Sequence, residues 1–299
     1  MKIKWFRILI YVSLVFLVVM LIRSDYLVIP EIVNLPALFI SVVLLFGAFF
    51  VLCYRWFVLL KRIKLPVRLT DAIVSVGLAI FAKYIPGKLL MVIGKVGHIK
   101  ENYEYRNDVL LTASFNDQLL AIWTGLLVGI LSFLYIQSIL LLLITLGIWF
   151  VFSLSIFTNL FHIFLRNMIQ RFTKREFNIE IIRIGDALFI MPWYILYWLL
   201  VGTGFFFLFQ SVYDSRLPLF VISVFPLSVV IGIVSIISPG GIGVREAVLA
   251  AFFISQFNTE VSVTMSGISR IWFLCGEFTL FAFALFIHFV SRKKFRHRK

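Results

Sequence analysis

The chain consists largely of long apolar runs separated by short polar connections. A helix needs about 20 mostly apolar residues to cross the hydrocarbon core of a bilayer, so runs of this length predict membrane-spanning helices. We therefore expect an all-α, polytopic bundle of transmembrane helices. Seven runs meet or approach the required length: residues 5–22, 37–60, 109–136, 138–160, 188–209, 217–237 and 268–290.

Two further apolar stretches, residues 71–97 and 238–257, are interrupted by proline and glycine. Proline removes a backbone donor and glycine lets the chain turn, so each interruption should end one helix and allow a short half-helix to begin. Paired interruptions of this kind are typical of an internal structural repeat with a binding site at its interface. The sequence itself shows no repeat with a period of 20 to 50 residues. The interruptions read Lys83-Tyr84-Ile85-Pro86-Gly87-Lys88 and Ser238-Pro239-Gly240-Gly241-Ile242-Gly243.

Basic residues gather at the ends of the apolar runs and give the chain a net charge of +14. This distribution follows the positive-inside rule, which predicts topology and disfavours a nucleic-acid-binding surface. The rule places both termini and the basic loops 61–68 and 166–183 in the cytoplasm. Two helices already cross between these loops, so residues 71–97 should be re-entrant and return to the cytoplasmic side. The same rule requires residues 244–257 to cross, which gives about eight crossings.

Composition limits the classes of function. The chain is 62% hydrophobic and 14% charged, with a mean hydropathy of +1.05, so its polar surface is too small to cover a soluble globule. We expect residues 1–299 to form a single integral membrane domain. No metal-ligand spacing, ATP-binding loop or nucleophile elbow occurs in the sequence, so we assign no catalytic residue, metal or cofactor, and an enzyme is the less favoured class.

The interruptions are the best candidates for a binding site. A helix that begins inside the membrane presents unpaired N–H groups and the positive end of its dipole, and both favour an anion. Basic residues accompany both predicted starts. Polar backbone persists in the hydrocarbon only where protein or a water-filled cavity satisfies it, so the interruptions predict a cavity. The candidate substrate-binding residues are Lys83, Tyr84, Pro86, Gly87, Lys88, Lys95, Pro239, Gly240, Gly241, Gly243, Arg245 and Glu246.

Three other ionisable residues, Asp117, Arg270 and Glu277, fall inside apolar runs. Arg270 and Glu277 are seven residues apart and should share one helix face. Ionisable groups at such depth usually face the bundle interior, either for gating and charge relay or as structural ion pairs. Asp117 or Glu246 is a possible partner for Arg270, Lys88 or Arg245, and the sequence does not choose among them.

The two interrupted motifs, Lys83 to Lys88 with Gly94-Lys95 and Ser238 to Glu246, resemble the lysylphosphatidylglycerol synthase transmembrane-region family over nearly the whole chain. The resemblance implies a flippase-like membrane domain linked to envelope lipid or polysaccharide pathways, in the cytoplasmic membrane of a bacterium or archaeon. The aminoacyl-transferase domain found in fused members is absent, so lipid lysylation is not implied.

The leading hypothesis is a lipid translocase that binds an anionic or lipid-linked headgroup in a midmembrane cavity. Membrane lipids are then the expected partners, together with envelope-biosynthesis enzymes. Two alternatives remain: a membrane-embedded transferase acting on a lipid-linked donor, with Asp117 or Glu246 as base, and a non-catalytic accessory protein of polysaccharide assembly.

Overall fold

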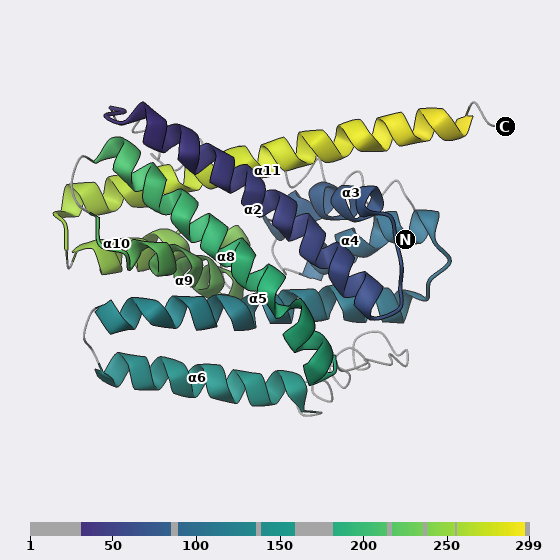
Figure 1. The fold of residues 1–299 in the computed structure, drawn as a ribbon, viewed down its shortest axis with the longest axis horizontal. Helices are drawn as coiled ribbons and strands as arrows, with labels where there is room; N and C mark the ends of the chain where they lie inside the picture. The colour runs from purple at the N-terminus through teal and green to yellow at the C-terminus, as the bar shows by residue number, and fades with distance from the viewer. Residues whose placement is uncertain are drawn as a thin grey trace.

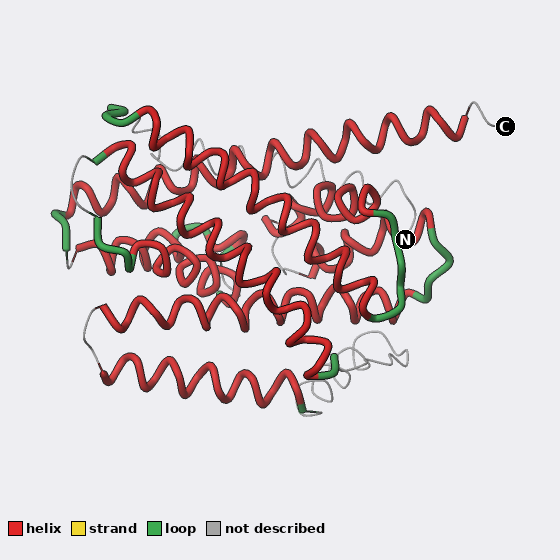
Figure 2. The backbone as a smooth tube through the Cα atoms, in the orientation of Figure 1, coloured by secondary structure: helices red, strands yellow, loops and turns green. Residues whose placement is uncertain are grey.

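The computed structural model describes residues 31–84, 89–135, 139–158, 182–213, 217–235, 238–254 and 256–296. All regular structure in these ranges is helical, and the described loops lie mainly at the two ends of the bundle (Figures 1 and 2). In chain order the elements are α2 (Leu35–Arg62), α3 (Leu69–Ala79), the 3₁₀ turn η1 (Ile80–Tyr84), α4 (Leu89–Asn102), α5 (Asn107–Tyr135), α6 (Ile139–Phe157), α8 (Ile184–Val212), α9 (Val221–Val234), the 3₁₀ turn η2 (Pro239–Gly241), α10 (Val244–Ile254) and α11 (Thr259–Arg296).

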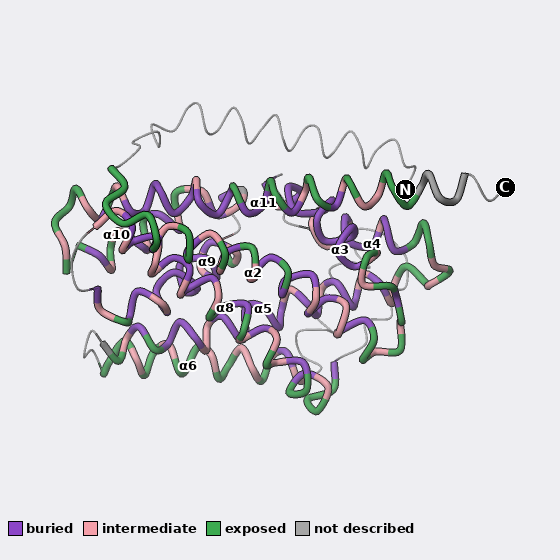
Figure 3. The backbone as a smooth tube through the Cα atoms, turned by 45° about the horizontal axis from the view of Figure 1, so that its top comes forward, coloured by how far each residue is buried: buried purple, intermediate pink, exposed green. Residues whose placement is uncertain are grey.

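The prediction of a polytopic helical bundle is confirmed. Within the described residues, five helices are long and apolar enough to cross a membrane: α2, α5, α6, α8 and α11. Each coincides with a predicted apolar run. The predicted run 5–22 lies outside the described residues. Helix α6 is the most peripheral of the five, since Ile156 is its one buried residue and the others are partly or fully exposed (Figure 3).

The first interrupted stretch forms a helix pair that returns to its starting end. Tyr103, just after α4, donates its hydroxyl to Asp71 near the start of α3 over 2.7 Å, and the same hydroxyl accepts from the Arg68 backbone N–H over 3.0 Å. The ends of the pair therefore lie together, as the re-entrant prediction requires. We call α3, η1 and α4 the first broken pair.

The predicted spanning run 217–237 and the second interrupted stretch both differ from their predictions. Helix α9 has only 14 residues and α10 only 11, which is about 21 and 16 Å of helix against a hydrocarbon core of about 30 Å. Ser132 near the end of α5 donates its hydroxyl to that of Ser223, near the start of α9, over 3.0 Å. The ring centroids of Phe133, also near the end of α5, and Phe252, near the end of α10, are 5.5 Å apart. Since both ends of α9–α10 lie beside the end of α5, residues 244–257 do not cross. We call α9, η2 and α10 the second broken pair.

Backbone conformation explains this return. Gly240, Gly241 and Gly243 have φ of 61°, 73° and 82°, values that residues with a Cβ rarely adopt. The chain therefore reverses between α9 and α10 where the positive-inside prediction required continuation across the membrane. The basic end of α11 nevertheless lies at the same end of the molecule as the basic loop 61–68, because α11 alone completes the return.

The long helices and broken pairs form two inverted repeats. Residues 35–135 run long helix, broken pair, long helix, and residues 184–296 follow the same order after α6. Helices α2 and α8 pack antiparallel: Val33 before α2 bonds the Ser211 carbonyl over 2.8 Å, and Arg62 at its other end pairs with Asp186 over 2.6 Å. Helix α3 packs on α11 just as α9 packs on α5. The arrangement resembles the inverted-topology repeats of secondary transporters.

Candidate functional site

The two interruptions meet inside the bundle, where η1 contacts η2. A Cβ on Gly240 would lie 2.4 Å from two ring atoms of Tyr84, so only glycine lets this ring rest on the η2 backbone. Arg270 of α11 donates from Nη1 to the Gly240 carbonyl over 3.4 Å and lies 5.1 Å from the Tyr84 ring centroid. Residues far apart in sequence and predicted as site residues are thus brought together.

Glu277 organises the charges at this junction. Its side chain is fully buried and accepts from Lys83 Nζ and, over 2.8 Å, from the Tyr84 hydroxyl. Arg270 and Glu277 therefore both reach Tyr84 from one face of α11, as their seven-residue spacing predicted. The carboxylate is held between a lysine and a phenol, which offsets the cost of its burial.

Arg245 begins the half-helix α10 and has a different kind of environment. Its side chain is only 4% exposed, its Nε has no hydrogen-bond partner, and it forms no ion pair with any described residue. The guanidinium instead lies 4.7 Å from the Phe273 ring centroid and 5.3 Å from that of Phe225. Lys83 Nζ lies over the same Phe273 ring at 5.3 Å. Cation–π contact stabilises the charge of Arg245 without neutralising it.

Glu246, the neighbour of Arg245, serves the helix backbone. Its carboxylate accepts from the Gly243 N–H over 2.7 Å, three residues earlier, in the manner of a capping box. We use the name cation cluster for Lys83, Arg245 and Arg270 together with Glu277. In this cluster three cations face one carboxylate.

A second network has the same chemistry on other helices. Asp117 of α5 accepts from Lys95 Nζ of α4 and, over 2.6 Å, from the Tyr194 hydroxyl of α8. Arg55 of α2 lies 3.7 Å from the same carboxylate and 4.4 Å from the Tyr194 ring centroid. Asp117 thus pairs with Lys95 and Arg55, which were not among the partners considered from sequence. We call these four residues the Asp117 network.

Two of these residues were missed from the sequence. Arg55 carried a usable signal, since it is an ionisable residue inside the apolar run 37–60. Tyr194 carried no such signal, because a single aromatic residue in a chain rich in aromatic residues is most simply interpreted as a packing residue.

Backbone contacts hold Lys95 in place. The Trp56 indole donates to Ser75 Oγ over 3.3 Å, and Ser75 donates to the Lys95 carbonyl over 2.7 Å. Lys95 Nζ in turn lies 5.2 Å from the Trp56 ring centroid. Helices α2, α3 and α4 are therefore locked together directly beside the Asp117 carboxylate.

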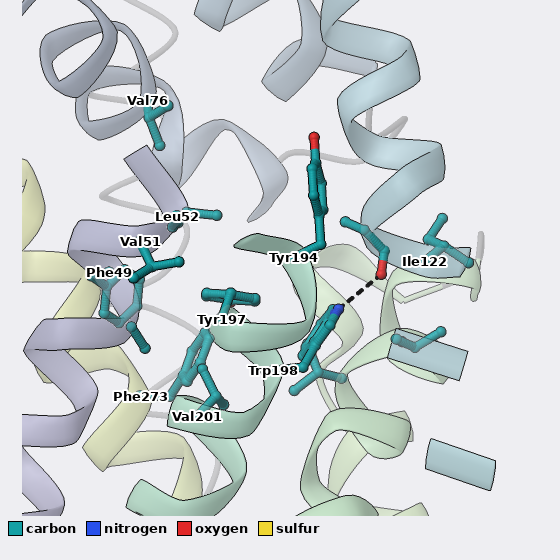
Figure 4. Close-up of a cluster of buried hydrophobic side chains, with 14 of the residues drawn as sticks. Phe49, Val51, Leu52, Val76, Ile122, Tyr194, Tyr197, Trp198, Val201 and Phe273 are labelled. Atoms are coloured by element: carbon teal, nitrogen blue, oxygen red, sulfur yellow. Dashed lines mark hydrogen bonds between the residues drawn. The ribbon is translucent and has the colours of Figure 1, made fainter. Parts of the chain in front are cut away.

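Tyr197 lies between the two charged groups. It is one turn after Tyr194 on α8, and the two tyrosines project with Trp198 into the core shown in Figure 4. Arg55 lies 4.8 Å from the Tyr197 ring centroid, and the phenol is within electrostatic range of Asp117, Arg245 and Glu277. The neighbouring Trp198 indole bonds the Ala121 carbonyl over 3.0 Å and fixes α8 against α5 (Figure 4). Tyr197 thus lies in the part of the core that separates the cation cluster from the Asp117 network.

A third polar group lies at the end of the first broken pair, outside the spanning helices. Asp71 accepts from Tyr103 over 2.7 Å and lies 3.4 Å from His98 Nε2. Burial raises the pKa of Asp71, but the hydrogen bonds from His98 and Tyr103 outweigh it and hold this pKa below its ordinary value. His98 also packs on His288 of α11, with ring centroids 5.5 Å apart. This group fastens the first broken pair to α11.

The remaining predicted residues divide into two sets. Gly241 and Gly243 shape the second interruption, and Pro239 begins η2. Pro86, Gly87 and Lys88 lie outside the described residues, between η1 and α4.

Comparison with known proteins identifies the family. No curated protein and no solved structure matches the chain. The family model for the lysylphosphatidylglycerol synthase TM region matches residues 5–275, which include both broken pairs and the cation cluster except for Glu277. The chain therefore belongs to the lysylphosphatidylglycerol synthase transmembrane-region family, as a multi-pass membrane protein.

Proposed function

We propose that this protein is a lipid translocase in which the cation cluster binds the anionic headgroup of a lipid or lipid-linked substrate. One observation carries the proposal: two buried arginines and the partly buried Lys83 face a single buried carboxylate where the two broken pairs meet. The family to which the chain belongs is connected with membrane lipid or envelope biosynthesis.

A cation buried away from water is costly unless an anion or several acceptors compensate it. Arg245 has aromatic faces as neighbours and no ion-pair partner among the described residues. A phosphate or carboxylate headgroup would supply the missing charge and accept hydrogen bonds from the guanidinium.

The backbone adds to this attraction. Arg245 is the second residue of α10, so the positive end of that helix points into the same region. Half-helix starts of this kind bind anionic substrate groups in transporters with inverted repeats.

The arrangement of the two repeats is suited to moving a bound headgroup from one side of the membrane to the other. The first broken pair enters from the end of the molecule that holds the basic loop 61–68, and the second from the opposite end. A headgroup at their junction would face alternate sides if the repeats moved against each other.

The test is lipid scrambling in liposomes that contain the purified protein and labelled phosphatidylglycerol or phosphatidylcholine. The wild type should move the anionic lipid faster, and Arg245→Gln should lose most of that movement. The control Arg62→Gln removes a guanidinium of similar charge from a half-exposed pair with Asp186 and should leave transport unchanged. Equal rates for Arg245→Gln and the wild type would refute the proposal. Covalent modification of a lipid-linked donor by the purified protein, without lipid movement, would favour a transferase.

A further inference from the structure

An apolar groove runs between α2, α3 and α11 and has a volume of about 280 Å³. Its rim is open: Phe46, Phe50 and Phe283 are 44%, 53% and 51% exposed, whereas Cys53 at its base is buried. Figure 1 shows α2 and α11 crossing, with α3 beside them. The lining consists of Phe46, Phe49, Phe50, Cys53, Ile73, Gly276, Thr279, Leu280 and Phe283.

The lining selects a hydrocarbon occupant. The two helices that form its sides, α2 and α11, are long and apolar enough to span the membrane, so we expect the open rim to face lipid chains. Thr279 carries the one hydroxyl in the lining, and that hydroxyl donates to the Cys275 carbonyl of its own helix over 2.8 Å. Since no charged side chain lines the groove, it provides neither a counter-ion nor a polar network for a headgroup.

The groove is separated from the cation cluster by one pair of rings. Phe49 in its wall contacts Phe273, with ring centroids 5.3 Å apart. Lys83 and Arg245 lie on Phe273, at 5.3 and 4.7 Å from its centroid. Gly276, in the lining, precedes Glu277, which holds Lys83. An amphiphile with its headgroup among the cations would thus have an apolar channel at the same level of α11.

Gly276 sets the shape of this wall. A Cβ at this position would lie 2.2 Å from Cε2 of Phe49 and 3.0 Å from Leu45. The absence of a side chain lets Phe49 lie flush against α11, so the groove ends at the ring pair that borders the cations.

From this juxtaposition we infer that the groove binds the hydrocarbon chain of the lipid whose anionic headgroup occupies the cation cluster. The inference rests on the proposed function and adds the substrate class: an amphiphile with a long alkyl or acyl chain that enters laterally between α2 and α11. A soluble anion without a chain would use only half of the site.

The test uses a phosphatidylglycerol with a photoreactive diazirine on one acyl chain, in vesicles that contain the full-length protein. Adducts mapped by mass spectrometry should concentrate on residues 46–53 and 276–283. Thr279→Trp places an indole in the groove, and Val263→Trp places the same indole on an exposed part of α11 outside it. If the indole displaces two methylene groups of the lipid chain from the groove, binding weakens about tenfold. Thr279→Trp should therefore reduce the adducts about tenfold. Val263→Trp should not change them.

Three outcomes separate the chain site from the translocase. Adducts spread evenly over lipid-facing helices such as α6, and unaffected by Thr279→Trp, would overturn the chain site even if scrambling still required Arg245. Adducts confined to the groove, in a protein that moves no lipid, would support the chain site and refute the translocase. Disulfides between Thr279→Cys and cysteines introduced in residues 12–19 of a Cys-free background, without lipid adducts, would assign the groove to the chain's own first apolar run and overturn the inference.

Discussion

Asp117 and Glu277 occupy closely similar chemical surroundings although they lie on different helices. Each buried carboxylate accepts from one lysine and one tyrosine, and an arginine lies over the ring of that tyrosine. Burial makes an isolated carboxylate costly, and the lysine and phenol provide a counter-charge and a hydrogen bond. The same solution in both networks shows how this bundle holds charge in a low-dielectric interior.

At the residue scale, we predict that Asp117→Asn destabilises the fold. Lys95 and Arg55 would remain buried without their carboxylate, and breaking a buried pair in this way costs about 3 to 5 kcal/mol. The measurement is the thermal unfolding midpoint in detergent. Asp186→Asn is the matched control, because its pair with Arg62 is partly exposed and is worth about 0 to 1 kcal/mol.

A second substitution separates charge from packing in this prediction. Lys95→Met removes one of the two cations left by Asp117→Asn while keeping an aliphatic side chain beside Trp56. The double variant should recover part of the lost stability. A single Asp117→Asn variant that unfolds at the wild-type temperature would show that the Asp117 network contributes little to stability.

At the scale of the elements, the second broken pair depends on glycine at the turn. We predict that Gly240→Ala lowers the unfolding midpoint, because a positive φ costs about 1 to 2 kcal/mol for a residue with a Cβ. The added Cβ would also overlap the Tyr84 ring at 2.4 Å and displace that phenol from Glu277.

Gly147→Ala in α6 is the control for this substitution, since a Cβ there meets no atom within 4 Å. In a helix interior this change should stabilise by about 0.5 to 1 kcal/mol. If Gly240→Ala and Gly147→Ala shift the midpoint equally and in the same direction, the role assigned to Gly240 is wrong.

At the scale of the whole molecule, the inverted repeats predict where a crosslink will block transport. Ser132 of α5 and Ser223 of α9 lie 3.0 Å apart, hydroxyl to hydroxyl, and belong to different repeats. In a background without Cys53 and Cys275, a Ser132→Cys and Ser223→Cys disulfide should stop lipid movement if the repeats slide against each other. Reduction should restore it.

The single-cysteine variants control for the substitutions themselves. Transport that continues at the wild-type rate in the fully oxidised double variant would show that α5 and α9 do not separate during the cycle. The proposed headgroup site would then have to open by another movement.

Sequence alone determined the class of the molecule and the locations of its interruptions. Long apolar runs can satisfy their backbone in lipid only as helices, so α2, α5, α6, α8 and α11 follow from local composition. Proline restricts the backbone and glycine allows it to turn, so the breaks near Tyr84 and Gly240 were also predictable. The same local signals marked Arg245, Arg270 and Glu277 as ionisable residues in apolar surroundings.

Tertiary structure decided the partners and the path of the second broken pair. Asp117 meets Lys95, Arg55 and Tyr194 because α2, α4, α5 and α8 converge, and no spacing within one helix encodes that convergence. Residues 244–257 return beside α5 because three turn glycines, Gly240, Gly241 and Gly243, reverse the chain. Helix α11 is then long enough to cross back. Local sequence limits the conformation of each segment, whereas the choice of contacts depends on how all the segments pack.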